Sequence, residues 1–202
     1  MIEKIKLLLA ITVIAVQFSY GQGSIKFNPG FGFGFFYPKD VNDYIESLYN
    51  NAYMTYGTTD IFMNFYASLG IIKEFEGDIA LKVSGEIAFA PKIISVTNGE
   101  GSGFYSLNRL SPMVCIDKYF PVADNSALFI GLGAHLNYLQ FKSWNAITPG
   151  GHLELGYRLS FDDYDVEAFV AGDYINGKAD SNMSLNYTGI RAGAYVAFGF
   201  SE

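Results

Sequence analysis

Near its C-terminal end the chain alternates strictly between two kinds of side chain, and this pattern constrains the fold more than any other feature. From Ile190 to Phe200 every even position is apolar, whereas the odd positions carry Gly, Ala, Tyr and the charged Arg191. Side chains of a β-strand point alternately to the two faces of the sheet. A period of two therefore predicts a strand with a different environment on each side.

The same alternation recurs in runs that are separated mostly by Gly, Pro, Asn, Asp or Ser. Each run is at least as long as the roughly 9–11 residues that a tilted strand needs to cross a bilayer. Short connections alternate with mostly longer ones, which favours an antiparallel, up-and-down order. The predicted strands are Lys26–Phe36, Asp60–Ile72, Asp78–Lys92, Phe104–Lys118, Ala127–Phe141, Gly151–Phe161, Tyr164–Asn176 and Leu185–Phe200, and the longer connections are Tyr37–Thr59, Ile93–Gly103, Lys142–Gly150 and Gly177–Ser184.

Alternation alone does not say which face points outward, because a soluble lipocalin-type barrel is apolar inside and polar outside. The chain is 50% hydrophobic, 17% aromatic and only 16% charged, against about 25% charged residues in soluble domains. The polar faces are rich in small residues, as suits a narrow lumen, and aromatic residues gather at both ends of the strands, as at two membrane interfaces. These features favour an all-β, eight-stranded transmembrane barrel with its apolar faces outward. Pro112 falls on an outward face and cannot donate to the ladder, so we expect a β-bulge there.

The first 21 residues have the features of a secretion signal rather than of the fold. Lys4 and Lys6 precede the apolar run Leu7–Val16, and Ser19 and Gly21 are small residues at the spacing of a cleavage site. The alternative is a membrane anchor, but a run of ten residues is short against the roughly 20 that a spanning helix needs. We therefore expect a signal peptide at 1–21 and one barrel domain at 22–202.

The leader, the eight alternating runs and the closing strand with Phe198 and Phe200 resemble the small outer-membrane barrels of Gram-negative bacteria. The resemblance is to the OmpA-like, OmpX and OmpW-like superfamily of the porin family, covers essentially the whole mature chain and rests on architecture. It implies an outer-membrane location in the cell envelope, with periplasmic turns and extracellular loops. It also implies membrane lipids and the barrel-insertion machinery as partners, and a monomeric state.

The inward faces carry a set of opposite charges that we interpret as a lumen charge network. A turn at Asp162–Asp163 places Arg158 opposite Glu167 and His152 opposite Asp173. Buried charges need partners, so the set favours a plug of salt bridges; a narrow gated pore is the alternative. The members of the predicted network are Lys82, Glu86, Arg109, Glu154, Arg158, Glu167, Asp173 and Arg191.

The first long connection contains a segment with helical periodicity. Within Asp40–Asn50, apolar and aromatic residues recur at the spacing of an amphipathic helix. We expect a short helix in the first extracellular loop, either as a brace on the barrel mouth or as part of a surface, 37–59, for an extracellular partner.

Other chemistry has little support in the sequence. The net charge of −7 argues against a nucleic-acid partner. Cys115 is the single cysteine, which excludes an internal disulfide and a cysteine-cluster metal site. His135 and His152 lie on different strands and have no serine at a catalytic spacing. We therefore predict no catalytic, cofactor or metal residues, and a non-enzymatic structural or surface-interaction barrel. The alternatives are a narrow channel or transporter for small or apolar solutes and, behind it, a lipid-modifying enzyme.

Overall fold

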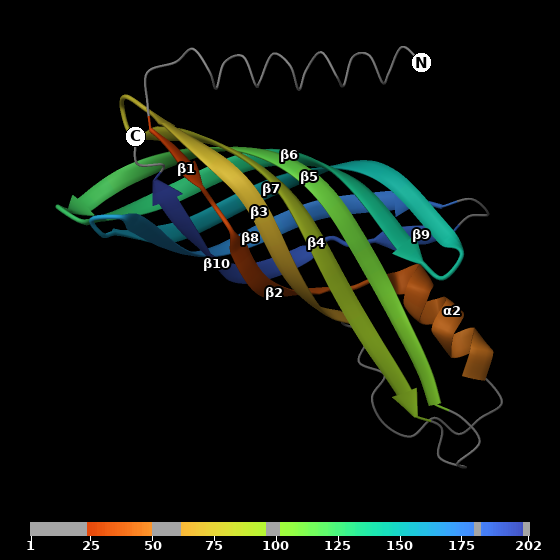
Figure 1. Cartoon of the computed structure of the whole chain (residues 1–202). Coiled ribbons are helices and arrows are strands. Elements are labelled where there is room, and N and C mark those ends of the chain that lie inside the picture. The colour runs from red at the N-terminus through yellow and green to blue at the C-terminus, as the bar shows by residue number, and fades with distance from the viewer. Residues whose placement is uncertain (1–23, 50–61, 96–101, 180–182, 200–202) are drawn as a thin grey trace, which may run out of the picture.

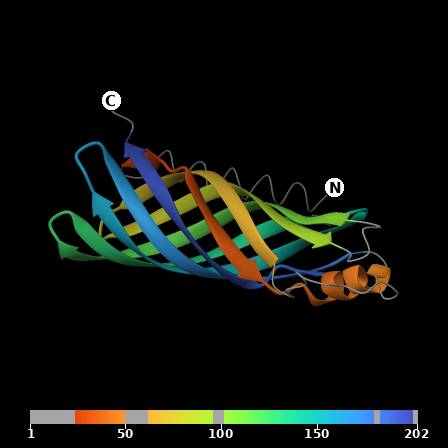
Figure 2. The ribbon, with the colours of Figure 1, turned by 90° about the horizontal axis from the view of Figure 1, so that it is seen from below.

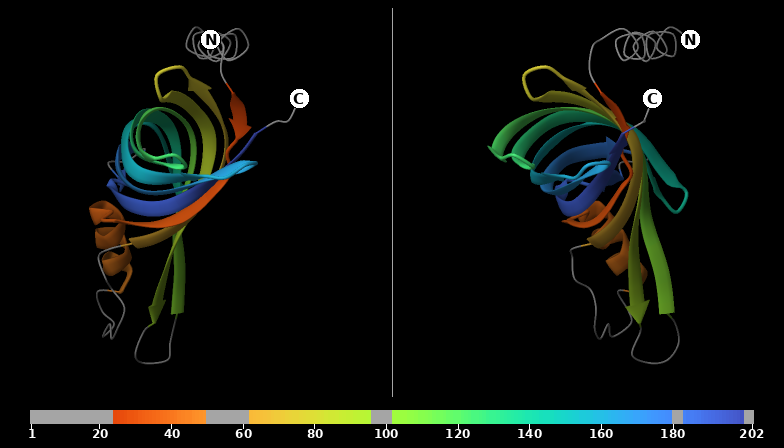
Figure 3. Two further views of the ribbon diagram at one scale, coloured as in Figure 1. Left: turned by 90° about the vertical axis from the view of Figure 1, so that its left-hand side faces the viewer. Right: turned by 60° about the vertical axis from the view of Figure 1, so that its left-hand side comes forward.

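The computed structural model describes residues 24–49, 62–95, 102–179 and 183–199, and nearly all of them belong to one antiparallel sheet closed into a ring (Figures 1 and 3). The signal peptide expected at 1–21 lies outside the described residues. The strands are β1 (Ile25–Phe27), β2 (Gly30–Phe36), β3 (Phe62–Phe75), β4 (Ile79–Ser95), β5 (Ser102–Ala123), β6 (Ser126–Phe141), β7 (Trp144–Ser160), β8 (Tyr164–Lys178), β9 (Ser184–Asn186) and β10 (Gly189–Gly199), and the helix is α2 (Lys39–Tyr49).

Two of the eight strands in the ring are interrupted. Asn28 and Pro29 separate β1 from β2, and Tyr187 and Thr188 separate β9 from β10. β10 pairs with β8 on one side and with β2 on the other, which closes the ring (Figure 2). The prediction of an eight-stranded, antiparallel, up-and-down barrel is confirmed.

The apolar face of each strand points outward. Leu132 and Leu155 are 69% and 57% exposed, whereas Arg158 and Arg191 are only 8% and 5% exposed. The predicted assignment of faces is therefore correct. Large apolar side chains are exposed all round the ring, on β2, β3, β4, β5, β6, β7, β8 and β10.

The two ends of the barrel differ. At one end, β1 begins, β10 ends and tight turns join β3 to β4, β5 to β6 and β7 to β8; Gly77 and Asp78 have φ values of +81° and +58° in the first of these turns. We call this the turn end. At the other end, the loop end, α2 lies beside the mouth and the β4–β5 hairpin extends beyond the rest of the barrel (Figure 1).

Two local predictions are wrong. The expected bulge at Pro112 is absent: Leu110 pairs with Tyr138 and Met113 with His135 in one continuous register, so the missing N–H only leaves a gap in the ladder. The expected loop Lys142–Gly150 is mostly strand, because a turn at Lys142–Ser143 lets β7 begin at Trp144.

The predicted amphipathic helix is present as α2, and it braces the loop end of the barrel. Val41 and Ile45 are completely buried, and the ring of Tyr44 meets that of Trp144 edge-on at 4.6 Å. Asp40 accepts a hydrogen bond from the backbone N–H of Ser184 at 2.8 Å. No helix in the described ranges is long and apolar enough to cross a membrane.

Glycines on the inward face make room for the aromatic side chains of the lumen. A Cβ atom at Gly32 would lie 2.3 Å from the hydroxyl of Tyr66 and 2.2 Å from the carbonyl oxygen of Ala192, whereas Gly85 has open space around it. We expect Gly32→Ala to lower the free energy of unfolding by about 1–3 kcal/mol through overpacking. The matched control Gly85→Ala is expected to leave it unchanged or slightly higher. Urea unfolding of the two variants in the same detergent provides the measurement, and equal free energies would contradict close packing around Gly32.

Candidate functional site

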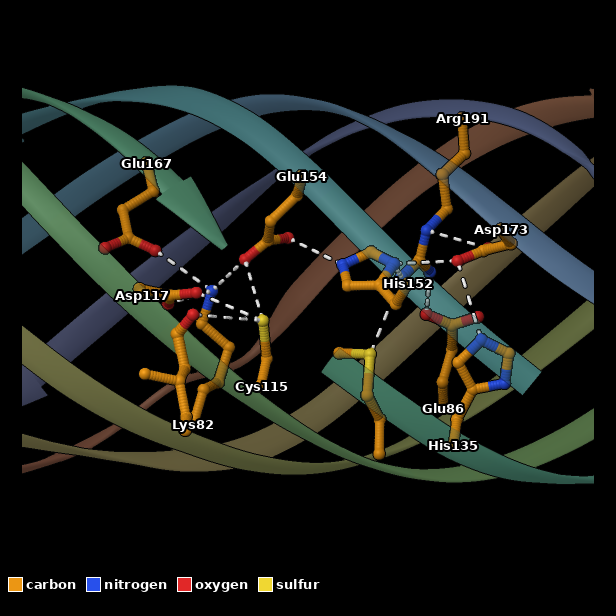
Figure 4. Close-up of polar contacts among 12 residues, drawn as sticks. Lys82, Glu86, Cys115, Asp117, His135, His152, Glu154, Glu167, Asp173 and Arg191 are labelled. Atoms are coloured by element: carbon orange, nitrogen blue, oxygen red, sulfur yellow. Dashed lines mark hydrogen bonds and ion pairs between the residues drawn. The ribbon is translucent and has the colours of Figure 1, made fainter. Parts of the chain in front are cut away.

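The candidate site is the interior of the barrel, where the charged side chains meet. All eight residues of the predicted network lie inside, and each is at most 8% exposed. They come from β4, β5, β7, β8 and β10, and their contacts divide them into two groups along the lumen (Figure 4).

The group nearer the turn end is centred on Lys82. Its ammonium nitrogen lies 2.7 Å from Glu154 Oε1, 3.0 Å from Asp117 Oδ2 and 3.6 Å from Glu167 Oε2. Arg158 contacts Glu167 at 2.7 Å, as the predicted register requires. Lys26 contacts the carboxylates of Glu74 and Asp165, and Arg158 also contacts Glu74. We call the whole group, including Lys26, Glu74 and Asp165, the turn-end cluster.

The second group, which we call the central cluster, contains Arg109 and Arg191 with Glu86 and Asp173. Both arginines contact both carboxylates, and Arg191 Nε lies 3.2 Å from Asp173 Oδ2. Two positive and two negative charges therefore balance.

His152 connects the two clusters. Its Nδ1 lies 2.7 Å from Asp173 Oδ1, and its Nε2 lies 3.1 Å from Glu154 Oε2. The predicted pairing of His152 with Asp173 is confirmed by the register. His135 contacts the side chain of Asn137 at 2.9 Å and the carbonyl oxygen of Gly151 at 3.1 Å, and its Nε2 lies 3.7 Å from Asp173 Oδ1.

Two glycines of β6 allow side chains of β5 and β7 to meet. Cys115, Gly133 and His152 pair in one row across β5, β6 and β7, and Asp117, Gly131 and Glu154 form another. A Cβ atom at Gly131 would lie 2.3 Å from Asp117 Oδ1, 2.7 Å from Glu154 Cγ and 3.0 Å from Cys115 Sγ. Because Gly131 and Gly133 have no side chains, the carboxylates, the thiol and the imidazole of the neighbouring strands can come together across β6.

The sequence reasoning missed the aromatic residues that fill the lumen beside the charges. The Lys82 ammonium lies 4.3 Å from the ring centre of Tyr195, and the Arg158 guanidinium lies 3.7 Å from that of Tyr119. Tyr195 also stacks on Phe169 at 4.5 Å. The alternation along the last strand could have identified Tyr195 as a lumen residue, because Tyr195 shares its face with Arg191. Tyr119 lies near a short turn, where the aromatic residues were expected at a membrane interface, but it points inward and is 5% exposed.

A cavity of about 430 Å³ opens at the turn end of the lumen. Tyr119 and Arg158 form part of its lining, so it reaches the edge of the turn-end cluster. Its acidic lining residues are Glu74, Glu76, Asp78 and Asp124.

No protein-family model matches the sequence, and no curated protein matches it. The structure, in contrast, is similar to solved barrels. Neisserial surface protein A (NspA) matches with a TM-score of 0.59 and 11% identity, over 89% of this chain and 98% of its own. The outer membrane protein OprG from Pseudomonas aeruginosa matches with a TM-score of 0.51 and 13% identity, over 90% of this chain and 99% of its own. At these identities the similarity establishes the fold.

Proposed function

We propose that this chain, which has the fold of the small eight-stranded outer-membrane β-barrels, is an integral outer-membrane protein with a plugged lumen. Its role is structural or in surface interaction, without enzymatic activity. The observation that carries the plug is the complete burial of Lys82, Glu154 and Glu167, with Lys82 in contact with both carboxylates across the lumen.

The exposed apolar face supports the membrane location. A soluble protein rarely exposes a contiguous apolar patch of more than a few hundred Å², yet here large apolar side chains are exposed all round the barrel. In water this surface would favour aggregation, whereas acyl chains solvate it.

The ion pairs support a plug rather than a pore. A permeating ion would have to separate Lys82 from Glu154, or Arg109 and Arg191 from their carboxylates, in a lumen where these groups are shielded from bulk water. Leaving one member of a buried pair without its partner costs about 3–5 kcal/mol. The filled lumen therefore argues against a narrow channel, which was the alternative interpretation of the sequence.

The surroundings of the histidines support a non-enzymatic role. Among the described residues, the hydrogen bonds of His135 and His152 involve Asn137, Gly151, Glu154, Asp173 and Arg191, and none involves a serine. A serine nucleophile needs a base within hydrogen-bond reach.

Interaction with an extracellular partner is proposed for loop 37–59, of which residues 50–59 lie outside the described part. Its helix α2 is anchored by Val41 and Ile45 and leaves Asp43, Glu46 and Leu48 exposed. We take the functional unit to be a monomer, because the ring closes within one chain.

Planar-bilayer recording tests the plug. The purified, refolded protein is expected to give no steady conductance. The double variant Lys82→Ala/Glu154→Ala, which removes one charge of each sign, is expected to conduct because it opens the turn-end cluster. A gel of unboiled and boiled samples establishes folding, since a folded barrel migrates differently from the boiled chain. Steady conductance of the folded wild-type protein would contradict the plug, and recovery of the native protein as a soluble periplasmic protein would contradict the membrane location.

A further inference from the structure

Three potential metal ligands meet inside the barrel, in a grouping that their sequence spacing does not suggest. Cys115 Sγ, a ring nitrogen of His152 and a carboxylate oxygen of Glu154 all lie within 4.8 Å of one another, and all three residues are buried (Figure 4). Cys115 Sγ lies 4.0 Å from Glu154 Oε1, and His152 Nε2 lies 3.1 Å from Glu154 Oε2. Ligand atoms of a tetrahedral zinc site are separated by about 3.3–3.7 Å, given its bond lengths. Small side-chain movements thus suffice to surround an ion.

The orientation of His152 provides a second, independent observation. Its Nδ1 lies 2.7 Å from Asp173 Oδ1, and metal-binding histidines almost always donate their other ring N–H to such an outer partner. With the proton on Nδ1, a neutral imidazole turns the lone pair of Nε2 toward Glu154 Oε2. A metal ion between Nε2 and Glu154 Oε2 would take the place of the proton that an imidazolium has there.

The distribution of charge provides a third observation. Among the described residues, the turn-end cluster has three cations, Lys26, Lys82 and Arg158, that face five carboxylates. The central cluster is balanced, so the excess of two negative charges lies in the half of the lumen that contains Cys115. Uncompensated buried charge is costly, and a divalent ion would compensate it. The five carboxylates are those of Glu74, Asp117, Glu154, Asp165 and Glu167.

Two glycines leave room beside the potential ligands, and a cavity lies at the turn end of the same lumen. Gly131 and Gly133 keep the floor between β5 and β7 free of side chains. The cavity of about 430 Å³ at the turn end includes Arg158 of the turn-end cluster in its lining, and its acidic residues attract cations to that end of the lumen.

We propose that Cys115, His152 and Glu154 bind one divalent transition-metal ion of the zinc class. Thiolate and imidazole ligands favour such an ion over Mg²⁺ or Ca²⁺, which prefer oxygen ligands. The metal–sulfur bond forms as the thiol of Cys115 loses its proton to Asp117, its hydrogen-bond acceptor at 3.1 Å, and from there to water. Lys82 stays beside Asp117 and Glu167, and the Nδ1–Asp173 contact holds the imidazole in place.

Cobalt(II) titration of the refolded full barrel, without a histidine tag, tests the proposal. We expect saturation at one equivalent with a thiolate-to-cobalt charge-transfer band, and displacement of the cobalt by zinc. The chain has a single cysteine, so the band itself identifies Cys115 in the wild-type protein. No saturable binding, or saturable binding without this band, overturns the proposal, whether or not any variant folds.

Variants identify the other ligands. Cys115→Ser is expected to abolish the band, and His152→Gln and Glu154→Gln are each expected to weaken binding at least 10-fold, since even outer partners contribute about 10- to 100-fold. His135→Gln is the matched control. His135 hydrogen-bonds Asn137 and Gly151 and lies 3.7 Å from Asp173, but none of these contacts is with Cys115 or Glu154, so the variant is expected to bind like the wild type. Unchanged affinity in folded His152→Gln and Glu154→Gln would overturn the assignment.

Discussion

Replacement of Lys82 by methionine is expected to lower the free energy of unfolding by about 3–5 kcal/mol, which is the cost of leaving a buried charge without its partner. The ammonium is fully buried and lies within 3.6 Å of three carboxylates, those of Asp117, Glu154 and Glu167. Methionine keeps most of the volume and removes the charge. Equilibrium unfolding in urea, from lipid vesicles, provides the measurement.

Lys118→Met is the matched control. Lys118 also belongs to the β4–β5 pair, but its side chain is 42% exposed and lies 3.8 Å from Asp78. Surface pairs contribute about 0–1 kcal/mol, so the control is expected to unfold nearly like the wild type. Adding Glu154→Gln to Lys82→Met should recover part of the loss, because the two sites share one interaction. Equal stability of Lys82→Met and Lys118→Met would mean that water reaches the turn-end cluster, which contradicts the plug.

The sequence predicted the strands and their faces because the barrel has two distinct environments. Parity placed Arg158 and Glu167 inside, and the short turn at Asp162–Asp163 fixed their register, which the structure reproduces. Where a hairpin has an evident turn, alternation and pairing reinforce each other.

Strand ends were less predictable. Pro149 and Gly150 read as a loop, yet both pair within β7, opposite Leu136 and His135. A closed ring supplies neighbours on both sides, so it extends strands through residues that local propensity disfavours. Pro112 is tolerated for the same reason: the paired residues on either side of it hold the register without a bulge.

The grouping of Cys115 with His152 was beyond the sequence, because it depends on the registers of two successive hairpins. The first contains a shift between Pro121 and Ala123, and the second turns at Lys142–Ser143, inside a predicted loop. A one-residue error in either register points a side chain to the other face. The charges were predictable from parity one strand at a time, but the contacts across β6 were not.

Leu132→Arg is expected to lower the free energy of unfolding in lipid vesicles by about 2–4 kcal/mol, the cost of a cation at the midplane of the bilayer. Leu132 is 69% exposed and lies in the middle of β6, opposite Ile116 and Leu153. Ile147→Arg is the matched control, since Ile147 is 71% exposed but lies three residues from the start of β7, near the loop end. There the cost falls to about 0–1 kcal/mol. A protein whose outer face contacts water would tolerate both arginines equally, so equal unfolding free energies would contradict the membrane location, and a penalty confined to Leu132→Arg would support it.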